Sequence, residues 1–163
     1  MKKEKKTFLD NNKSEDFIQQ EMLQLKRVTK VTKGGRRFHF SVLMLVKDDK
    51  KKAIGFACAK GNEVSSAIKK AVRKAKKNLV SYFPNETRTV PHDIFFKFKA
   101  TKIMIKPAPL GNGIKAGSSL NTIFKFLEIK DVSAKIIGSN NKLNVVRASF
   151  LALDKLTGKR NNW

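Results

Sequence analysis

A run of alternating apolar residues at positions 38–46 constrains the fold of this 163-residue chain more than any other feature. Side chains at every second position of a β-strand lie on one face, so a period of two predicts a strand. The pattern is carried by Phe38, Phe40, Val42, Met44 and Val46. Two glycines, Gly34 and Gly35, precede the run in KVTKGGRRFHF. Because glycine accepts positive φ, they predict a tight, basic turn that the Phe38 and Phe40 face anchors on its sheet.

The rest of the first half is predicted to contain two more strands and a helix. One strand starts at Met22 and runs into the basic turn. After the alternating run, the sequence KDDKKK at 47–52 is predicted to be a polar hairpin connection. Residues 53–60 are predicted to form a strand lined with small residues. Residues 63–83 form the clearest helix of the sequence, with Pro84 just beyond it. Its apolar positions are Val64, Ile68, Ala71, Val72, Ala75 and Leu79. Three strands followed by a basic amphipathic helix predict a small α+β layer.

The second half is predicted to hold another sheet with two helices. Residues 84–93, with two prolines and no period, are the best boundary. Two alternating apolar runs follow and predict two strands joined by a turn at 99–101. A Pro- and Gly-rich loop at 107–117 then leads into a predicted helix at 118–129. Ser118 or Ser119 could cap this helix. A strand at 132–139 and a last helix from Asn140 or Asn141 complete it, the helix bearing Leu143, Val146, Phe150 and Leu153. We expect a flexible basic arm at 1–20, domains at 21–84 and 85–157, and a short tail at 158–163.

The charge of the chain indicates its partner. Lys and Arg number 36 against 13 Asp and Glu, which gives a formal charge of +23 and an isoelectric point near 10.4. Nucleic acid is the polyanion that such a chain binds most readily, because each phosphate contact releases counterions. An anionic membrane surface is the alternative. Membrane insertion is not expected, since no run approaches the roughly 18 apolar residues of a spanning helix. The first 22 residues lack the apolar core of a signal peptide, so the chain is expected to stay in the cytosol.

The candidate RNA-binding residues fall into two groups. The first surrounds the glycine pair, where backbone N–H groups and long cations could reach the same phosphate: Lys26, Arg27, Lys30, Lys33, Gly34, Gly35, Arg36 and Arg37. The second comprises Lys60 and the polar side of the predicted helix: Lys69, Lys70, Arg73, Lys74 and Lys77. For both groups the alternative is a set of solvated charges on a hairpin connection and on an exposed helix face.

Catalytic chemistry has little support in the sequence. Cys58, the single cysteine, lies among small and apolar neighbours, as a buried inert thiol does, and His39 and His92 are far apart. Gly111, Gly113 and Gly117 are spaced GxGxxxG, one residue longer than the dinucleotide-binding fingerprint, so a tight strand-to-helix turn is favoured over a cofactor site. No paired carboxylates, Walker A sequence or metal-binding motif is visible. We expect no enzyme activity, cofactor, metal or small-molecule substrate.

Four blocks of the sequence carry a family resemblance. RVTKVTKGGRRFHFSVLMLV, EVSSAIKKAVRKAKKNL, PAPLGNGIKAG and GSNNKLNVVRASFLAL occur in the order and spacing of the fifth protein of the small ribosomal subunit, bacterial type. The resemblance covers roughly residues 21–156. It implies a first domain similar to a double-stranded-RNA-binding fold, with three strands and a helix, and a C-terminal α/β domain whose sheet is backed by two helices.

The resemblance also implies partners and roles. The family binds 16S-type ribosomal RNA, contacts the fourth and eighth small-subunit proteins, lines the channel through which mRNA enters, supports subunit assembly and influences decoding accuracy. The loop matching 28–37 reaches toward head and neck RNA, where changes are associated with spectinomycin resistance. The segment matching 111–121 faces the fourth protein, which makes interface candidates of Gly111, Asn112, Gly113, Lys115 and Asn121. A free-standing double-stranded-RNA-binding regulator or RNA chaperone is the alternative function.

The sequence departs from the family pattern at four positions. Ala57 and Ala59 stand where glycines are common, which puts a close approach of that strand to RNA in doubt. Asn121 stands where an arginine is frequent in the contact with the fourth protein, and Lys142 replaces a usual proline before the last helix. The short tail would lack contacts that longer C-termini make.

Overall fold

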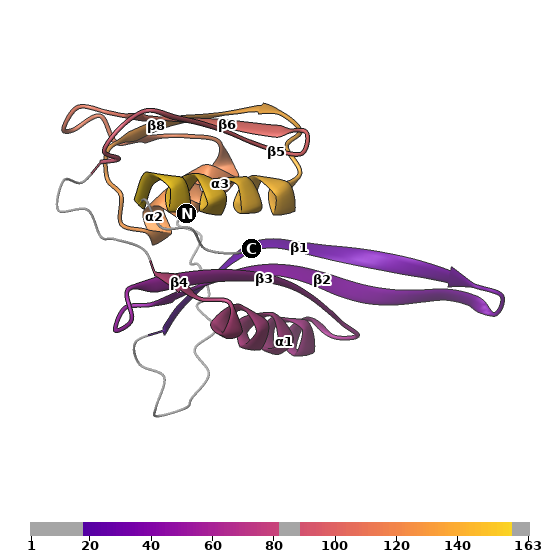
Figure 1. Cartoon of the computed structure of the whole chain (residues 1–163). Helices are drawn as coiled ribbons and strands as arrows, with labels where there is room; N and C mark the ends of the chain where they lie inside the picture. The colour runs from indigo at the N-terminus through magenta and orange to yellow at the C-terminus, as the bar shows by residue number, and fades with distance from the viewer. Residues whose placement is uncertain (1–17, 82–88, 158–163) are drawn as a thin grey trace, which may run out of the picture.

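The computed structural model describes residues 18–81 and 89–157, and these form four layers (Figure 1). From bottom to top in Figure 1 they are helix α1, a first sheet, the pair of helices α2 and α3, and a second sheet. The first sheet and α1 belong to the first half of the chain, and the other two layers belong to the second half. The expected arm up to residue 17, the 82–88 part of the expected boundary and the tail at 158–163 lie outside the described residues.

The first sheet is antiparallel, with the order β1-β2-β3-β4. Its strands are β1 (Ile18–Thr32), β2 (Gly35–Asp48), β3 (Ala53–Gly61) and β4 (Val80–Ser81). The three strands predicted from the sequence are confirmed, but β1 begins at Ile18, four residues before Met22. Helix α1 (Val64–Lys77) covers one face, where Ala67, Ala71 and Ala75 pack on Val42, Met44 and Val46 of β2.

Strand β2 is buried on both faces, which explains why its sequence is apolar at odd as well as even positions. Residues 42–48 are all buried. Val42, Met44 and Val46 face α1, whereas Leu43 and Leu45 point the other way and pack against the helices of the second half. The alternating pattern predicted the strand correctly, and the second domain supplies the cover for the other face.

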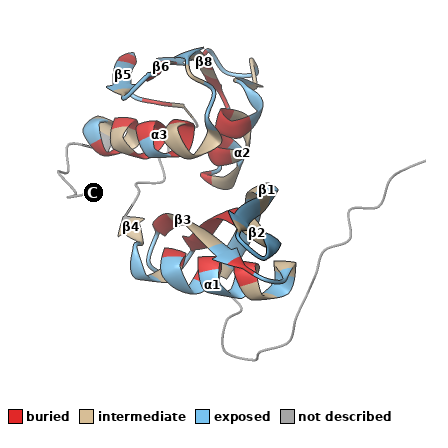
Figure 2. Cartoon of the chain, turned by 90° about the vertical axis from the view of Figure 1, so that its right-hand side faces the viewer, coloured by how far each residue is buried: buried red, intermediate tan, exposed pale blue. Residues whose placement is uncertain are grey.

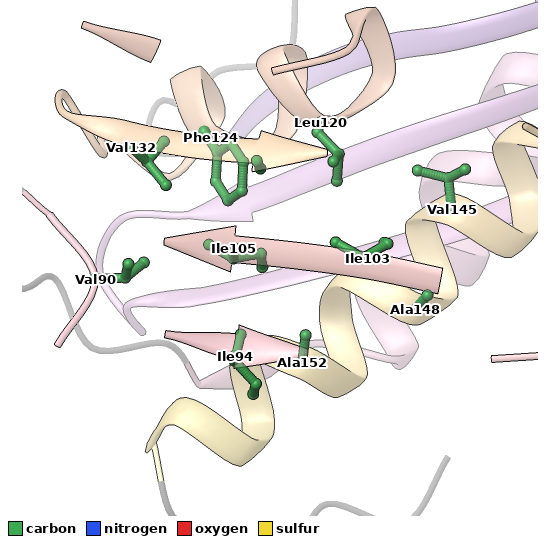
Figure 3. Close-up of a cluster of buried hydrophobic side chains, with 11 residues drawn as sticks. Val90, Ile94, Ile103, Ile105, Leu120, Phe124, Val132, Val145, Ala148 and Ala152 are labelled. Carbon is green, nitrogen blue, oxygen red and sulfur yellow. The ribbon is translucent and has the colours of Figure 1, made fainter. Parts of the chain in front are cut away.

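The second sheet has the order β5-β6-β8-β7, with β7 parallel to β8 and the other pairs antiparallel. The strands are β5 (Ile94–Phe98), β6 (Thr101–Pro107), β7 (Ile114–Lys115) and β8 (Val132–Gly138). Helices α2 (Ser118–Phe126) and α3 (Lys142–Thr157) cover one face. Figure 3 shows the core between them, where Ile103 and Ile105 of β6 lie near Leu120 and Phe124 of α2 and Val145 of α3.

A third core joins the two halves of the chain, because α2 and α3 are apolar on two sides. Val145, Ala148 and Ala152 of α3 face their own sheet. Val146 and Phe150 face the first sheet, and the ring of Phe150 meets Phe56 of β3 edge-on at 4.8 Å. The helical face predicted from Leu143, Val146, Phe150 and Leu153 is therefore the face that packs between the domains.

Polar contacts cross the same junction. Lys47 of β2 is only 1% exposed, and its Nζ donates to the carboxylates of Asp49, at 2.9 Å, and Glu128, which follows α2. Lys142, at the position where the resembled family has proline, donates from Nζ to the carbonyl oxygen of Leu23 in β1 at 3.4 Å. The two halves are thus held together by a buried cation as well as by apolar packing.

Three details of the predicted elements are wrong. The first helix ends at Lys77 instead of running to residue 83, because Val80 leaves it to pair with Ile54 at the sheet edge. Helix α2 is preceded by Gly117, and neither Ser118 nor Ser119 caps it, since both already lie in its first turn. Strand β7 was not predicted, because two residues are too short for a periodic pattern. The start of α3 is confirmed, with the Asn141 side chain accepting from the N–H of Leu143.

Candidate RNA-binding surfaces

The β1–β2 hairpin projects beyond the rest of the molecule (Figure 1). The last β2 residue that pairs with β3 is Phe40, so among the described strands residues 35–39 have only β1 as a neighbour. At the turn, Gly35 has a φ of +128°, and the Thr32 hydroxyl donates to its carbonyl oxygen at 3.0 Å. A Cβ built on Gly34 or Gly35 would meet no atom within 4 Å. The glycine pair therefore leaves the tip of the hairpin bare and approachable.

The two faces of this hairpin differ in chemistry. Directly paired residues share a face, which places Lys26 beside Ser41 and Lys60, and Lys30 beside Arg37. These cations lie on the face that, farther along the sheet, packs against α2 and α3. The opposite face carries Arg27, whose guanidinium lies 3.9 Å from the centroid of the Phe38 ring. Lys33 and Arg36 stand exposed at the turn.

Phe38 does not anchor the hairpin in a core, contrary to the expectation. Its side chain is 46% exposed, and Val31 near the tip is 74% exposed. The reason is that neither α1 nor β3 reaches as far along the sheet as this part of the hairpin, so no element of the described chain covers it. The Arg27–Phe38 stack therefore forms part of the exposed surface.

Helix α1 presents the second predicted group of cations. Lys69, Lys70, Arg73, Lys74 and Lys77 are all exposed, and Figure 2 shows the exposed residues along the outer side of α1. No acidic residue lies in its first turn. Ser65, Ser66, Lys69, Lys70 and Arg73 line a shallow open hollow on this side. The helix carries a continuous positive face that points away from the second domain.

The structure thus divides the predicted residues between two surfaces. Because α1 covers one face of the first sheet, its cations lie on the opposite side from Lys26, Lys30, Arg37 and Lys60. The tip cations Lys33 and Arg36 lie at the far end of the hairpin. A partner that touches all of them would therefore have to reach both sides of the sheet and the hairpin tip.

The small residues of β3 have a structural explanation. Ala57 and Ala59 belong to the cluster that packs under α1, and a Cβ on Gly55 would lie 2.6 Å from the carbonyl oxygen of Ala75. Small side chains at these positions let α1 lie close to the strand. Having alanine instead of glycine at these two positions therefore affects how α1 packs on β3, because both side chains face the helix.

The glycine-rich loop forms the tight turn that its sequence indicated. Gly111 and Gly113 have φ values of +86° and +71°, and the Gly113 N–H donates to the buried carboxylate of Asp131 at 2.9 Å. Sequence reasoning missed Asp131, whose only signal was an isolated acid before a strand. Asn121 lies on α2, and its buried Oδ1 has no hydrogen-bond partner among the described residues.

The remaining candidates for chemistry are the single cysteine and possible metal-binding clusters. Ser41 Oγ and Cys58 Sγ lie 3.5 Å apart, and Cys58 packs at the edge of the core between the domains. Within residues 18–81 and 89–157, no three His, Cys, Asp or Glu side chains gather as a metal site. In the same ranges, no helix is long and apolar enough to cross a membrane.

Comparison with known proteins gives the family. The model for ribosomal protein S5, N-terminal domain, matches residues 18–81, and that for the C-terminal domain matches residues 96–163. The chain belongs to the ribosomal protein S5 family. The first match coincides with the sheet β1–β4 and α1, and the second begins within β5.

Individual members of the S5 family cover most of the chain. It is 42% identical over 153 residues to the small ribosomal subunit protein uS5 of Chlamydia trachomatis serovar D, covering 94% of this chain and 92% of that protein. It is 41% identical over 147 residues to uS5 of Protochlamydia amoebophila, covering 90% of this chain and 87% of that protein. It is 48% identical over 135 residues to uS5 of Ehrlichia canis, covering 83% of this chain and 77% of that protein. The resemblance noted from the four sequence blocks is confirmed.

Proposed function

We propose that the chain fastens 16S-type ribosomal RNA through the β1–β2 hairpin and the outer face of α1, and thereby supports subunit assembly and accurate decoding. As a member of the S5 family it is a structural, non-enzymatic component of the small ribosomal subunit in the cytoplasm. Its RNA contacts, its neighbours and its influence on decoding are the parts that we infer from the surfaces.

The observation that carries the proposal is the charge of the projecting hairpin. Between Glu21 and Asp48 the sequence contains no acidic residue, whereas seven lysines and arginines occur there. All of them except Lys47 are exposed. Such a segment repels itself, and neutralisation by phosphates relieves the repulsion while counterions are released. No atom lies within 4 Å of a Cβ built on Gly34 or Gly35, so no side chain of the described residues screens the backbone of the turn from a phosphate.

The positions of the two surfaces suggest how they act together. The hairpin extends away from the body, and the cations of α1 face away from the second domain. A rigid protein with positive surfaces on separate sides can hold two RNA segments at a fixed distance. Phosphate contacts of this kind position RNA without reading its sequence. We infer that bridging two such segments is the contribution to assembly.

The loop before α2 is the proposed contact with the fourth small-subunit protein. Gly111 and Asn112 lie on the turn, where Leu110 is 82% exposed, and Lys115 is exposed on β7. The Asn121 Oδ1, which has no hydrogen-bond partner within residues 18–81 and 89–157, offers a buried acceptor at the same end of α2. Contacts with the eighth protein and with mRNA at the channel through which it enters belong to the same proposal.

A double substitution at the hairpin tip tests the RNA contact. Lys33→Ala with Arg36→Ala should weaken binding to 16S-type rRNA and lower the salt slope of log K by about 2, because each lost phosphate contact removes close to one counterion. Filter binding at several salt concentrations measures the slope. Lys51→Ala with Lys52→Ala, on the β2–β3 turn, removes the same charge and should leave most of the slope in place. An unchanged slope in the tip variant would show that Lys33 and Arg36 are solvated.

Sedimentation distinguishes this function from a free-standing double-stranded-RNA-binding regulator. The chain should remain with small subunits after a high-salt wash and should protect one rRNA junction in footprinting. Recovery mainly as free protein, with equal binding to any duplex, would favour the regulator and contradict the proposal.

A further inference from the structure

The outer face of the second sheet is uncovered in the described part of the chain. Helices α2 and α3 pack on one face, and no element lies on the other (Figures 1 and 2). Alternation along the strands places the residues of this outer face. They are Phe95 and Lys97 of β5, Lys102, Met104 and Lys106 of β6, Ser133, Lys135 and Ile137 of β8, and Lys115 of β7.

Strand register arranges these side chains in rows. Phe95 lies opposite Met104, which lies opposite Lys135. The next row holds Lys97, Lys102 and Ile137. Phe95 is 56% exposed and Ile137 is 42% exposed. The exposed ring of Phe95 therefore has Lys97 on its own strand and Lys135 in its row on β8.

The charges of this face are not balanced within the described chain. Lys106 has an ion pair with Asp93 at 3.6 Å, both side chains being more than half exposed. No ion pair is found for Lys97, Lys102, Lys115 or Lys135 among the described residues. Lys97 and Lys102 stand directly opposite each other, and like charges in that position destabilise a sheet. An anion bound between them would remove that repulsion.

The composition of the face favours RNA over a protein partner. Protein interfaces are depleted in lysine at their centres, whereas five lysines here surround three apolar side chains. Surfaces that bind single-stranded RNA combine a positive track for the backbone with aromatic rings on which bases stack. Stacking requires an unpaired base, because the bases of a duplex are already stacked on one another.

We propose that the outer face of the second sheet binds an unpaired segment of ribosomal RNA, with a base stacked on Phe95 and phosphates held by Lys97, Lys102 and Lys135. The source is the RNA of the subunit itself. A protein already fastened by its hairpin and α1 presents this sheet to neighbouring rRNA at high effective concentration, so a modest intrinsic affinity suffices. The inference rests on the proposed function and adds an RNA site on the second domain.

Fluorescence of a tryptophan at the proposed stacking position tests the site directly. The full chain has one tryptophan, so Phe95→Trp in a Trp163→Phe background places the only indole on the sheet. Single-stranded oligo(A) of roughly 12 nucleotides, within the usual site size, should quench the emission by stacking, and the matching duplex should not. Leu110→Trp in the same background is the control, since Leu110 is 82% exposed on the loop between β6 and β7, outside the rows of the sheet, and it should not be quenched. Equal quenching at both positions, or none at Phe95→Trp, overturns the proposal.

The lysines are tested in the same fluorescent background. Lys97→Gln with Lys102→Gln should lower the salt slope of the quenching midpoint by about 1.4, which is roughly 0.7 for each phosphate contact on a single strand. Lys51→Gln with Lys52→Gln removes the same charge from the β2–β3 turn and should leave the slope unchanged. A slope that falls equally in both variants would assign the effect to net charge and overturn the site.

Reconstituted subunits identify the RNA that occupies the face. Phe95→Ala should still enter subunits and should expose a small group of unpaired rRNA nucleotides to chemical modification, with mRNA binding unchanged. A change confined to mRNA binding, or no change in rRNA reactivity, overturns the commitment to rRNA. Failure of the unmutated chain to enter subunits would contradict the proposed function instead, so the two failures are distinguishable.

Discussion

At the scale of single residues, two kinds of glycine look alike in the sequence and differ in the structure. Gly55 lies under α1, where a Cβ would be 2.6 Å from the Ala75 carbonyl oxygen and 2.8 Å from that of Asn78. Gly34 lies at the hairpin tip, where a Cβ would meet no atom of the described residues within 4 Å. The first glycine permits close packing of a helix on a strand, and the second leaves backbone open toward a partner.

This contrast predicts opposite effects of the same substitution. Gly55→Ala should lower the free energy of unfolding by about 1–3 kcal/mol, because overpacking forces α1 away from β3. Gly34→Ala should leave stability nearly unchanged, and its effect should appear in RNA affinity. Urea unfolding and filter binding of both variants measure the two quantities. Equal stability losses would show that the crowding at Gly55 is relieved elsewhere.

At the scale of elements, α1 combines good packing on one side with electrostatic conflict on the other. Lys69 and Arg73, Lys70 and Lys74, and Arg73 and Lys77 are like-charge pairs four residues apart. Such pairs destabilise a helix by a few tenths of a kcal/mol each. Their presence on the exposed face fits the proposed contact with the phosphates of rRNA, which would relieve the repulsion.

Neutralising one pair should separate stability from binding. Lys70→Gln with Lys74→Gln should raise the free energy of unfolding by about 0.2–0.5 kcal/mol, because the repulsion is lost. The same variant should bind rRNA more weakly, with a salt slope smaller by about 2. Thermal unfolding at low salt and filter binding measure the two effects. A variant that gains stability and binds rRNA with an unchanged slope would mean that the outer face of α1 is only solvated.

At the scale of the whole molecule, the two domains share a core and should unfold together. Phe150 is 3% exposed and lies between α3 and Phe56 of the first sheet. Its neighbours in the cluster come from both halves, including Leu43, Leu45 and Ile123. Truncating it opens a cavity at the junction without touching the core under α1.

Phe150→Ala should therefore destabilise both domains at once. We expect a loss of about 3–5 kcal/mol, as for other buried phenylalanines, in a transition that probes on either domain report at the same urea concentration. Phe95→Ala, at an exposed position of the second sheet, is the matched control and should cost far less. If the first domain kept its full stability in Phe150→Ala, the shared core would not couple the domains.

The sequence by itself determined most of the elements, the family and the positions of the cations. Periods of two and 3.6 are local properties, so β2, the start of α1 and the strands around residue 100 could be predicted from neighbouring residues. Charge is also readable locally: the cations of the hairpin and α1 groups are all exposed, and their contact with RNA stays a prediction. The end of α1 was missed, because strand pairing of Val80 with Ile54 is a contact distant in sequence.

Only the tertiary structure decided what each apolar or basic face touches. The sequence does not show that Leu43 and Leu45 of β2 pack against the Val146 face of α3. These side chains are buried because the two domains pack against each other. Phe38 and Phe40 follow one period, yet Phe38 is 46% exposed because neither α1 nor β3 reaches that far along the hairpin. Lys26, Lys30 and Arg37 of the hairpin lie on the side of the sheet away from the cations of α1, because α1 packs on the other face. Periodicity fixes which side chains share a face, and long-range packing decides which faces water, or RNA, can reach.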